Sequence, residues 1–327
     1  MIVPRRRFLQ LTAGAAALSA APRFACAQTY PTRPVHLVVG FGAGSASDIN
    51  ARLVGQWLFE RLGQNFVIDN RAGAGGNIAT EFVARAQPDG YTLLYASTAI
   101  AINPSLYEGK LSYDFQRDFV PVASVVRTPF VMEVSPELPV KTVPEFIAYA
   151  KANPGKINMA TVGAGSAQHL YGEYFKMMTG IDMVPVHYRG AAPAITDMIA
   201  GRVQVMFDAI VSSIAYIRSG QIRALAVTTA TPQEQLLPGV PTIGQFVPGY
   251  EAGGWQGVCA PAKTPAEIVD RLNRQINAVL ADAKSNARLA ELGGQSAPGT
   301  PAEFGSFVMA ETDKWGKVVR AAGIKPD

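Results

Sequence analysis

The feature that most constrains the fold is a repeated alternation of short β-branched runs with stretches of helical length. Val35–Val39 is an apolar run typical of a strand buried on both faces. A glycine-rich turn follows, and Asp48–Leu62 then carries apolar residues at helical spacing until Gly63 ends the pattern. Strands separated by helices of this length indicate parallel βαβ units. We therefore predict an α/β fold.

The same alternation predicts further elements in chain order. Strands are expected at 66–68, 91–96, 120–126, 130–134, 157–160, 184–186, 203–207 and 224–227. Helices are expected at 78–86, 144–152, 169–179, 192–200, 265–282, 286–292 and 301–321. A chain of 327 residues is long enough for two domains. The predicted boundaries are 28–125 for the first part of domain 1, 126–229 for domain 2, and 230–327 for the second part of domain 1, which its C-terminal helices complete.

The N-terminus has the features of an export signal. Three arginines at 5–7 precede an apolar stretch, and Ala25-Cys26-Ala27 resembles a small-residue cleavage site. Residues 1–27 are therefore predicted to be a cleaved signal peptide, which places the mature protein in the periplasm. Arg-Arg-Arg-Phe-Leu at 5–9 also resembles the twin-arginine motif, so twin-arginine and general secretory export both stay open. No later segment is apolar for about 18 residues, so the mature chain is expected to be soluble.

Composition and charge exclude several classes of protein. With 48% hydrophobic and 17% charged residues, the chain is too apolar to be disordered. Four of its 29 basic residues lie in the acid-free segment 1–27, so the remaining chain balances 25 acidic residues with 25 basic ones and no nucleic-acid partner is expected. Cleavage leaves Cys259 as a single cysteine, expected to be buried and unreactive. The three histidines lie far apart in sequence, and no metal or cofactor is expected.

Three glycine-rich turns, at 40–48, 161–169 and 186–192, each follow an expected strand and precede an expected helix. In open α/β sheets, ligands bind at the carboxyl ends of strands, where turns expose backbone N–H groups and helix N-termini. A single such turn is explained by a tight bend with a capped helix, and Asp48 is expected to cap its helix or to hold water. Three turns in one chain favour an anion-binding cleft.

Dinucleotide binding is a weaker interpretation of the first turn. The turn lacks the third glycine of G-x-G-x-x-G, which is replaced by Ser45. Asp69, at the end of the next strand, lies where an acidic ribose ligand would be expected. Asp48, however, would place a carboxylate where the pyrophosphate should bind.

Four segments resemble the successive signature blocks of the Bug family, the extracytoplasmic solute-binding proteins of tripartite tricarboxylate transporters. They are VHLVVGFGAGSASDINAR (35–52), VIDNRAGAGGNIAT (67–80), VGAGSAQHL (162–170) and VPVHYRGAAPAITDMIAGRVQVMFD (184–208). The resemblance runs from about residue 30 to the C-terminus, and it departs at 42–44, where many members have Pro-Gly-Gly. It implies a type II periplasmic-binding-protein fold with a ligand cleft between two α/β domains. It also implies a carboxylated organic ligand, held largely by backbone N–H groups and bridging waters.

The residues themselves predict where such a carboxylate binds. The first turn would offer backbone N–H groups and hydroxyls, and Ser166 with its neighbours would face it from the second domain. His169 is expected to be a neutral hydrogen-bonding group. Asp208 would accept from a ligand hydroxyl or amine, or cap the next helix. The complete predicted ligand set is Phe41, Gly42, Ala43, Gly44, Ser47, Asp48, Thr98, Gly165, Ser166, His169, Tyr188, Arg189, Gly190 and Asp208.

Three aromatic or charged side chains have two open interpretations each. Tyr188 would stack on the ligand and donate to it, or pack as an aromatic at a strand end. Arg189 would bind the anion or lie solvated on the surface. Trp255, in a glycine-rich segment, would form a cleft wall or pack beside the hinge.

The favoured function is a monomeric periplasmic solute-binding protein, not an enzyme, that captures a small carboxylated compound. It would deliver this ligand to the membrane components of a tripartite tricarboxylate-type transporter. The alternative is an exported serine hydrolase using Ser166 and His169. That pair lacks a G-x-S-x-G motif and an obvious orienting acid.

Overall fold

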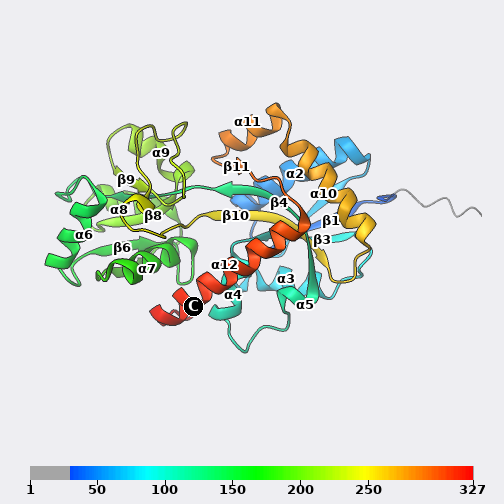
Figure 1. Ribbon diagram of the computed structural model, residues 1–327, viewed down its shortest axis with the longest axis horizontal. Coiled ribbons are helices and arrows are strands. Elements are labelled where there is room, and N and C mark those ends of the chain that lie inside the picture. The colour runs from blue at the N-terminus through cyan, green and yellow to red at the C-terminus, as the bar shows by residue number, and fades with distance from the viewer. Residues whose placement is uncertain (1–29, 327) are drawn as a thin grey trace, which may run out of the picture. The chain divides into compact units, whose positions relative to one another are not determined.

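The computed structural model describes residues 30–326, so the predicted signal peptide lies outside the described residues. Two β-sheets organise this part of the chain, and their strands alternate with helices (Figure 1). The α/β expectation is therefore confirmed. Over the same residues, no helix combines the length and the apolar character needed to cross a membrane.

The first sheet is six-stranded. Its core is parallel, because β1 pairs in parallel with both β2 and β3, whereas β10 runs antiparallel to β3 and β4. The carboxyl ends of β1, β2 and β3 therefore share one edge. The strand order is β11 (Gln295–Ser296), β4 (Phe119–Thr128), β10 (Gly254–Pro261), β3 (Thr92–Ser97), β1 (Val35–Val39) and β2 (Phe66–Asn70).

The second sheet is five-stranded. Strand β6 pairs in parallel with β7 and β8, and β5 runs antiparallel to β8 and β9. The chain enters this sheet directly from the first one, since β4 ends at Thr128 and β5 begins at Phe130. The next strand after β9 is β10 of the first sheet. The strand order is β7 (Val184–His187), β6 (Asn158–Thr161), β8 (Val205–Ala209), β5 (Phe130–Val134) and β9 (Arg223–Val227).

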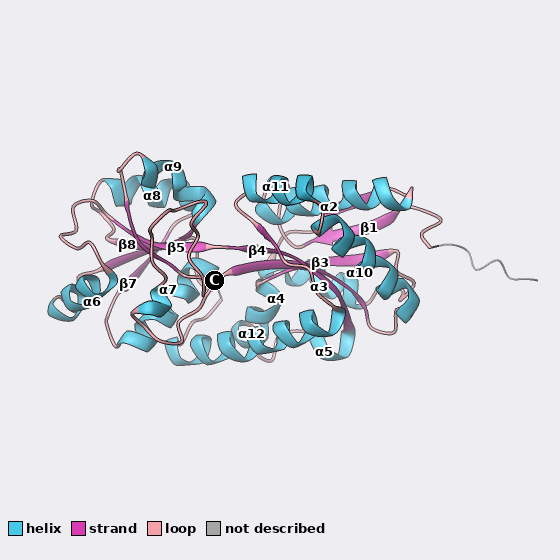
Figure 2. Ribbon diagram, turned by 45° about the horizontal axis from the view of Figure 1, so that its top comes forward, coloured by secondary structure: helices cyan, strands magenta, loops and turns pink. Residues whose placement is uncertain are grey.

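Helices flank both sheets. Figure 2 shows α2 and α11 on one side of the first sheet and α5 and α12 on the other. The helices that accompany the first sheet are α2 (Ala46–Leu62), α3 (Asn77–Ala84), α4 (Ala99–Leu106), α5 (Phe115–Asp118), α10 (Ala266–Leu280), α11 (Ala283–Glu291) and α12 (Pro301–Ala322). Those of the second sheet are α6 (Val143–Ala152), α7 (Ala167–Thr179), α8 (Ala191–Ile199) and α9 (Ile210–Arg218), and short 3-10 turns lie at Ala74–Gly76 and Ile243–Gln245. Each sheet with its helices forms one α/β domain.

The sequence predicts most of these elements, and two strands match residue for residue. These are β1 at Val35–Val39 and β5 at Phe130–Val134. The helices α4, α5 and α9 and the strands β10 and β11 were not predicted. Helix α4 contains Pro104, which normally argues against a helix interior, and β10 begins in a segment with three glycines that reads as a loop.

Helix α12 shows how local sequence fixes an element. Thr300 and Glu303 form a reciprocal capping box at its start, and Pro301 occupies the first helical position. Gly323 ends the helix with a left-handed φ of 62°. Between these ends the helix buries one face, including Phe304 and Trp315, which are 2% and 0% exposed.

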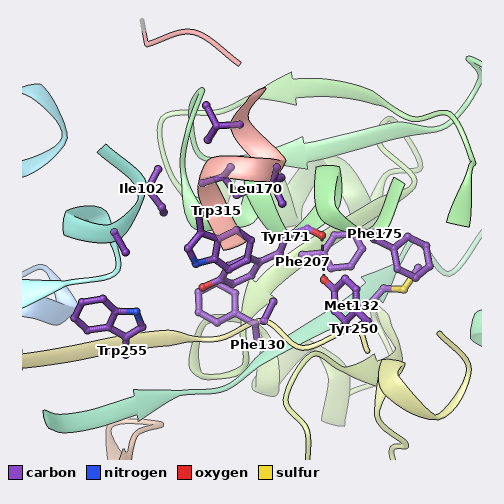
Figure 3. Packing of buried hydrophobic residues seen from close by; sticks show 14 of the residues in the cluster. Ile102, Phe130, Met132, Leu170, Tyr171, Phe175, Phe207, Tyr250, Trp255 and Trp315 are labelled. Atoms are coloured by element: carbon purple, nitrogen blue, oxygen red, sulfur yellow. Dashed lines mark hydrogen bonds between the residues drawn. The ribbon is translucent and has the colours of Figure 1, made fainter. Parts of the chain in front are cut away.

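One hydrophobic core runs through both domains. Trp315 of α12 lies against Tyr171 of α7 with ring centroids 5.1 Å apart, and Phe130 meets Tyr171 at 4.9 Å (Figure 3). Tyr250 donates a hydrogen bond to the backbone oxygen of Tyr171 at 3.0 Å. Trp255 packs edge-on against Phe304, which favours the packing interpretation of this tryptophan. Because aromatic residues from both domains share this cluster, α12 and α7 are joined by apolar contact.

The prediction that Cys259 is buried is also confirmed. Cys259 is free and fully buried on β10. Burial raises the pKa of its thiol, because the thiolate would lose its solvation there. The side chain therefore acts as a small apolar residue.

Gly257 on β10 should be intolerant of a side chain. A Cβ atom there would overlap Phe304 of α12 and lie 2.6 Å from the carbonyl oxygen of Ala123. We expect Gly257→Ala to lower the free energy of unfolding by about 1–3 kcal/mol through overpacking. The matched control is Gly253→Ala, whose Cβ would lie an ordinary 3.5 Å from the oxygen of Thr128. Urea denaturation of both variants measures the difference, and equal midpoints would contradict the packing argument.

Candidate functional site

The first glycine-rich turn leads from β1 into α2 and is closed by its own side chains. Ser45 is the N-cap residue, and its hydroxyl accepts the backbone N–H of Asp48 at 3.2 Å. Asp48 in turn accepts the N–H of Gly44 at 2.8 Å. The prediction that Asp48 itself caps the helix is therefore wrong. Ser45 is the cap, and Asp48, three residues later, supports the turn that precedes it.

Asp48 is charged but compensated. Its side chain is 3% exposed, and Arg52, one helical turn later, contacts both carboxylate oxygens at 2.9 and 3.0 Å. These bonds, led by the hydrogen bond from Arg52, hold the pKa of Asp48 below its ordinary value against the effect of burial. A carboxylate in the first turn of a helix also interacts favourably with the helix dipole. The turn is thus closed by hydrogen bonds, and the charge of Asp48 is balanced by Arg52.

The second turn, between β6 and α7, repeats this arrangement. Residues 42–46 and 163–167 both read Gly-Ala-Gly-Ser-Ala. Ser166 is the N-cap and accepts the N–H of His169 at 3.3 Å, while His169 Nδ1 accepts the N–H of Gly165 at 3.2 Å. Gly44 and Gly165 have left-handed φ values of 82° and 74°. The repeated pentapeptide is the sequence feature from which the similarity of the two turns could be predicted.

The repeated geometry decides which N–H groups remain for a ligand. The N–H groups of Gly44 and Gly165 already donate to Asp48 and His169, and those of Ser45 and Ser166 close the turns internally at 3.2 Å. The first two residues of each helix donate to no acceptor within residues 30–326, as is usual at helix N-termini. These four donors belong to Ala46, Ser47, Ala167 and Gln168.

Ser47 is held by a buried amide from β10. Gln256 donates its Nε2 to Ser47 Oγ at 3.3 Å. The Gln256 amide is oriented by two donors to its Oε1, Asn50 at 2.8 Å and Tyr95 at 3.2 Å. Because Ser47 Oγ accepts from Gln256, its own hydroxyl proton is available to an anion. Gln256, Asn50 and Tyr95 were not predicted as site residues.

The third turn lies beside the second. His187 at the end of β7 contacts Thr161 Oγ1 through Nδ1 at 2.6 Å. Gly190 precedes α8 without a side-chain cap, and Arg189 is exposed. The hydroxyl of Tyr188 donates to Asp197 at 2.9 Å, and burial together with this carboxylate raises the pKa of Tyr188 to about 12. This contact favours the packing interpretation of Tyr188.

Two further predicted residues are buried. Thr98 follows β3, and its hydroxyl accepts the N–H of Trp255 at 3.0 Å. Asp208 near the end of β8 is 0% exposed, and its oxygens accept from Gln168 and Ser213, both at 3.1 Å. The N-cap position of α9 belongs to Ala209. The structure therefore places Gln168 between Asp208 and the turn.

A hollow lies under the first turn at the carboxyl ends of β1 and β3. It has an empty volume of about 250 Å³ that includes open solvent. It is lined by Gly40, Phe41, Gly75, Gly76, Thr80, Leu94, Tyr95, Ala96, Ser97, Ala99 and Ile100. Gly40 is required there, because a Cβ atom would lie 2.8 Å from the Cα atom of Gly76.

The second turn contacts the first domain. Leu106 of α4 lies so close to Gly165 that a Cβ atom on this glycine would be 2.5 Å from Leu106 Cδ2. The second turn therefore abuts the helix that follows β3. Among residues 30–326, no group of three or more His, Cys, Asp or Glu side chains is arranged to hold a metal ion. Two α/β domains with glycine-rich turns at the carboxyl ends of their strands have the architecture of a two-domain solute-binding protein.

Comparisons with known proteins identify the family. A sequence model described as "Tripartite tricarboxylate transporter family receptor" matches residues 50–324. A protein of Bordetella bronchiseptica is 39% identical over 92% of this chain and 89% of its own length. Protein BugT of Bordetella pertussis is 36% identical over 91% and 92%, respectively. The chain therefore belongs to the tripartite tricarboxylate transporter receptor family, also called the Bug family, whose members are periplasmic solute-binding proteins.

Solved structures agree with this assignment. An R. palustris protein solved with adipate has a TM-score of 0.78 and 40% identity, covering 91% of this chain and 100% of its own. MatC from Rhodopseudomonas palustris, with bound malate, has a TM-score of 0.74 and 31% identity, covering 89% and 100%. The type II periplasmic-binding-protein fold and the family resemblance are thus confirmed.

The ion pair at the first turn predicts a pH-dependent stability. Asp48→Asn keeps an acceptor for the Gly44 N–H but removes the charge, and should cost about 1–2 kcal/mol at neutral pH. Because the folded pKa of Asp48 is lowered, the wild-type advantage is complete above the unfolded value of about 3.9 and disappears as the pH falls through the lower folded pKa.

Urea denaturation at pH 7, 5 and 3 tests this expectation. Glu81→Gln, which removes another i,i+4 ion pair with Arg85 but on the exposed surface, is the control and should change stability by less than about 1 kcal/mol. A loss in Asp48→Asn that stayed constant down to pH 3 would show that the charge of Asp48 does not stabilise the turn.

Proposed function

We propose that this protein captures a small carboxylated compound between the turns of its two domains and delivers it to the membrane components of a tripartite tricarboxylate-type transporter. The observation that carries the proposal is the repeated turn, which leaves N–H donors at the N-termini of α2 and α7 without partners among residues 30–326. Backbone N–H groups at a helix N-terminus are suited to anions. Relatives solved with adipate and malate support carboxylates as the ligand class.

Electrostatics at the turns supports an anionic ligand. Arg52 balances the charge of Asp48, and the Nδ1 atom of His169 acts as an acceptor, as in a neutral imidazole. Neither turn then carries an uncompensated negative charge. A carboxylate placed between them would meet two helix dipoles, each positive at its N-terminus.

The predicted N-terminal signal fits this role. We propose that residues 1–27 direct export and are cleaved after Ala27, by either the twin-arginine or the general secretory route. Mass spectrometry of periplasmic protein would test this directly. A mature N-terminus at Gln28 is expected, and an uncleaved chain in the cytoplasm would contradict it.

Binding should depend on the backbone of the first turn more than on its hydroxyl. Ser47→Ala should lose about 0.5–1.5 kcal/mol of binding free energy, the usual net value of one neutral hydrogen bond. Gly44→Val should lose far more, because Gly44 has a φ of 82° and its Cβ position opens into free space above the turn. A branched side chain would strain the turn and occupy that space.

Calorimetric titration with adipate and malate measures both effects. Gly239→Val is the matched control, because Gly239 has a φ of 72°, has open space at its Cβ position and belongs to no predicted binding turn. Both valine variants should lose similar stability, but only Gly44→Val should lose binding. Binding that survives Gly44→Val and disappears in Ser47→Ala would place the carboxylate elsewhere.

We also infer that the protein is not a serine hydrolase. Ser166 Oγ accepts the backbone N–H of His169, and His169 Nδ1 receives the N–H of Gly165. In a serine hydrolase the imidazole of the base accepts the hydroxyl proton of the serine, whereas Nδ1 of His169 already accepts the N–H of Gly165. The purified protein should therefore hydrolyse no p-nitrophenyl ester above background. Turnover that disappears in Ser166→Ala would reverse this conclusion.

A further inference from the structure

A hydrogen-bonded series of polar side chains connects the core of the second domain with the first turn of α7. Glu133 of β5, Asp208 of β8 and Ser213 of α9 are all 0% exposed. Ser213 Oγ lies 2.9 Å from Glu133 Oε1 and 3.1 Å from Asp208 Oδ2. The other oxygen of Asp208 accepts Nε2 of Gln168 at 3.1 Å, and Gln168 is only half-buried. This series therefore connects the buried carboxyl groups of Glu133 and Asp208 with the side-chain amide of Gln168 at the second turn.

The single hydroxyl proton of Ser213 limits how these hydrogen bonds can be arranged. Ser213 has a single hydroxyl proton and can donate it to only one of the two carboxyl groups. Burial raises the pKa of both carboxyl groups, and the charge of Asp208 adds to this effect at Glu133, whose pKa lies well above its ordinary value. Hydrogen bonds from Gln168 and Ser213 oppose the rise at Asp208, whereas Glu133 Oε2 has no hydrogen-bond partner within residues 30–326. Glu133 therefore holds a proton more firmly than Asp208, and a protonated Glu133 can donate to Ser213, which leaves the Ser213 proton for Asp208. Asp208 receives both Ser213 and Gln168, the donors that suit its ionised form.

The hydrogen bond to Asp208 fixes the amide of Gln168. Its NH2 group donates to Asp208 Oδ1 at 3.1 Å and therefore faces the carboxyl group. The other end of the amide, Oε1, then has no hydrogen-bond partner within residues 30–326, and it is not buried. Gln168 stands at the second position of α7, beside the N–H donors of the turn. The side chain thus offers an acceptor next to a group of donors.

At the equivalent position of the first turn, the side chain offers a hydrogen-bond donor instead of an acceptor. Ser47 accepts from Gln256 and keeps its hydroxyl proton for a ligand. Ser47 and Gln168 occupy the same place after the repeated Gly-Ala-Gly-Ser-Ala. One domain therefore presents a side-chain donor and the other a side-chain acceptor.

We propose that Gln168 sets the ligand selectivity of this site, by accepting a hydrogen bond from a hydroxyl or amino group that neighbours the bound carboxylate. This inference rests on the proposed function. Asp208 is a positioning residue, since it acts through the orientation of Gln168. The favoured ligands are 2-hydroxy or 2-amino acids, in preference to acids of the same length with a bare methylene at that carbon.

Matched pairs of acids test the inference. Calorimetry compares propionate with lactate, succinate with malate, glutarate with 2-hydroxyglutarate, and adipate with 2-hydroxyadipate. The wild-type protein should bind the hydroxylated member about tenfold more tightly in the pair that fits the site, the order expected for one hydrogen bond. Gln168→Leu should reduce this ratio to about twofold or less.

A second variant tests the orientation of the amide. Asp208→Asn supplies an NH2 group that can donate to Gln168 Oε1, so Gln168 can turn its own NH2 toward the ligand. The hydroxyl preference should then fall as it does in Gln168→Leu. Gln56→Leu, the same substitution on an exposed face of α2, is the control and should leave the ratio unchanged. Circular dichroism establishes that each variant is folded, and Gln168→Leu alone decides the matter if Asp208→Asn does not fold.

The outcomes separate this inference from the proposed function. Binding of carboxylates without any hydroxyl preference, or with a preference that survives Gln168→Leu, overturns the role of Gln168 alone. Failure of the wild-type protein to bind any of the eight acids overturns the proposed function, and the selectivity inference with it.

Discussion

The antiparallel pairing of β10 between β3 and β4 is the interaction on which the rest of the structure depends. It ties the strand that precedes Thr98 to the strand that leads into the second sheet. Trp255 and Thr98 exchange hydrogen bonds at 3.0 and 3.1 Å, and the next residue, Gln256, holds Ser47. One strand thereby supports the passage between the domains, the hollow beside β3 and the first turn. A shift of β10 by a single residue would disturb all three together.

The elements that sequence reasoning predicted well are those with local signals. An apolar run, a glycine turn and a capped helix lie within about 20 residues of one another, so β1 and the three turns were visible in the sequence. Strand β10 has no such signal, because its glycines disfavour a strand and its conformation is fixed by partners more than 100 residues away. Helix α4 was missed because Pro104 suggests a helix end.

The same distinction applies to the site. The turns were predictable, but the partners that orient their side chains come from distant segments. Gln256 lies 209 residues from Ser47, and no local pattern connects them. Asp48 was predicted from its place at a helix start to cap that helix or hold water, and Asp208 from its place at a strand end to accept from a ligand or cap the next helix. In the structure, Ser45 caps the helix, and Asp208 accepts a hydrogen bond from Gln168. Only the hydrogen-bond geometry reveals these partners.

The two domains also meet at Val211 of α9. This side chain is 45% exposed, yet a Cβ atom on Gly293 of the first domain would lie 2.6 Å from it. Position 211 thus lies at a seam between the domains and outside all three glycine-rich turns. An environment-sensitive dye attached there would change its fluorescence when the seam opens or tightens. Position 211 is therefore an attachment point for an optical reporter of this seam.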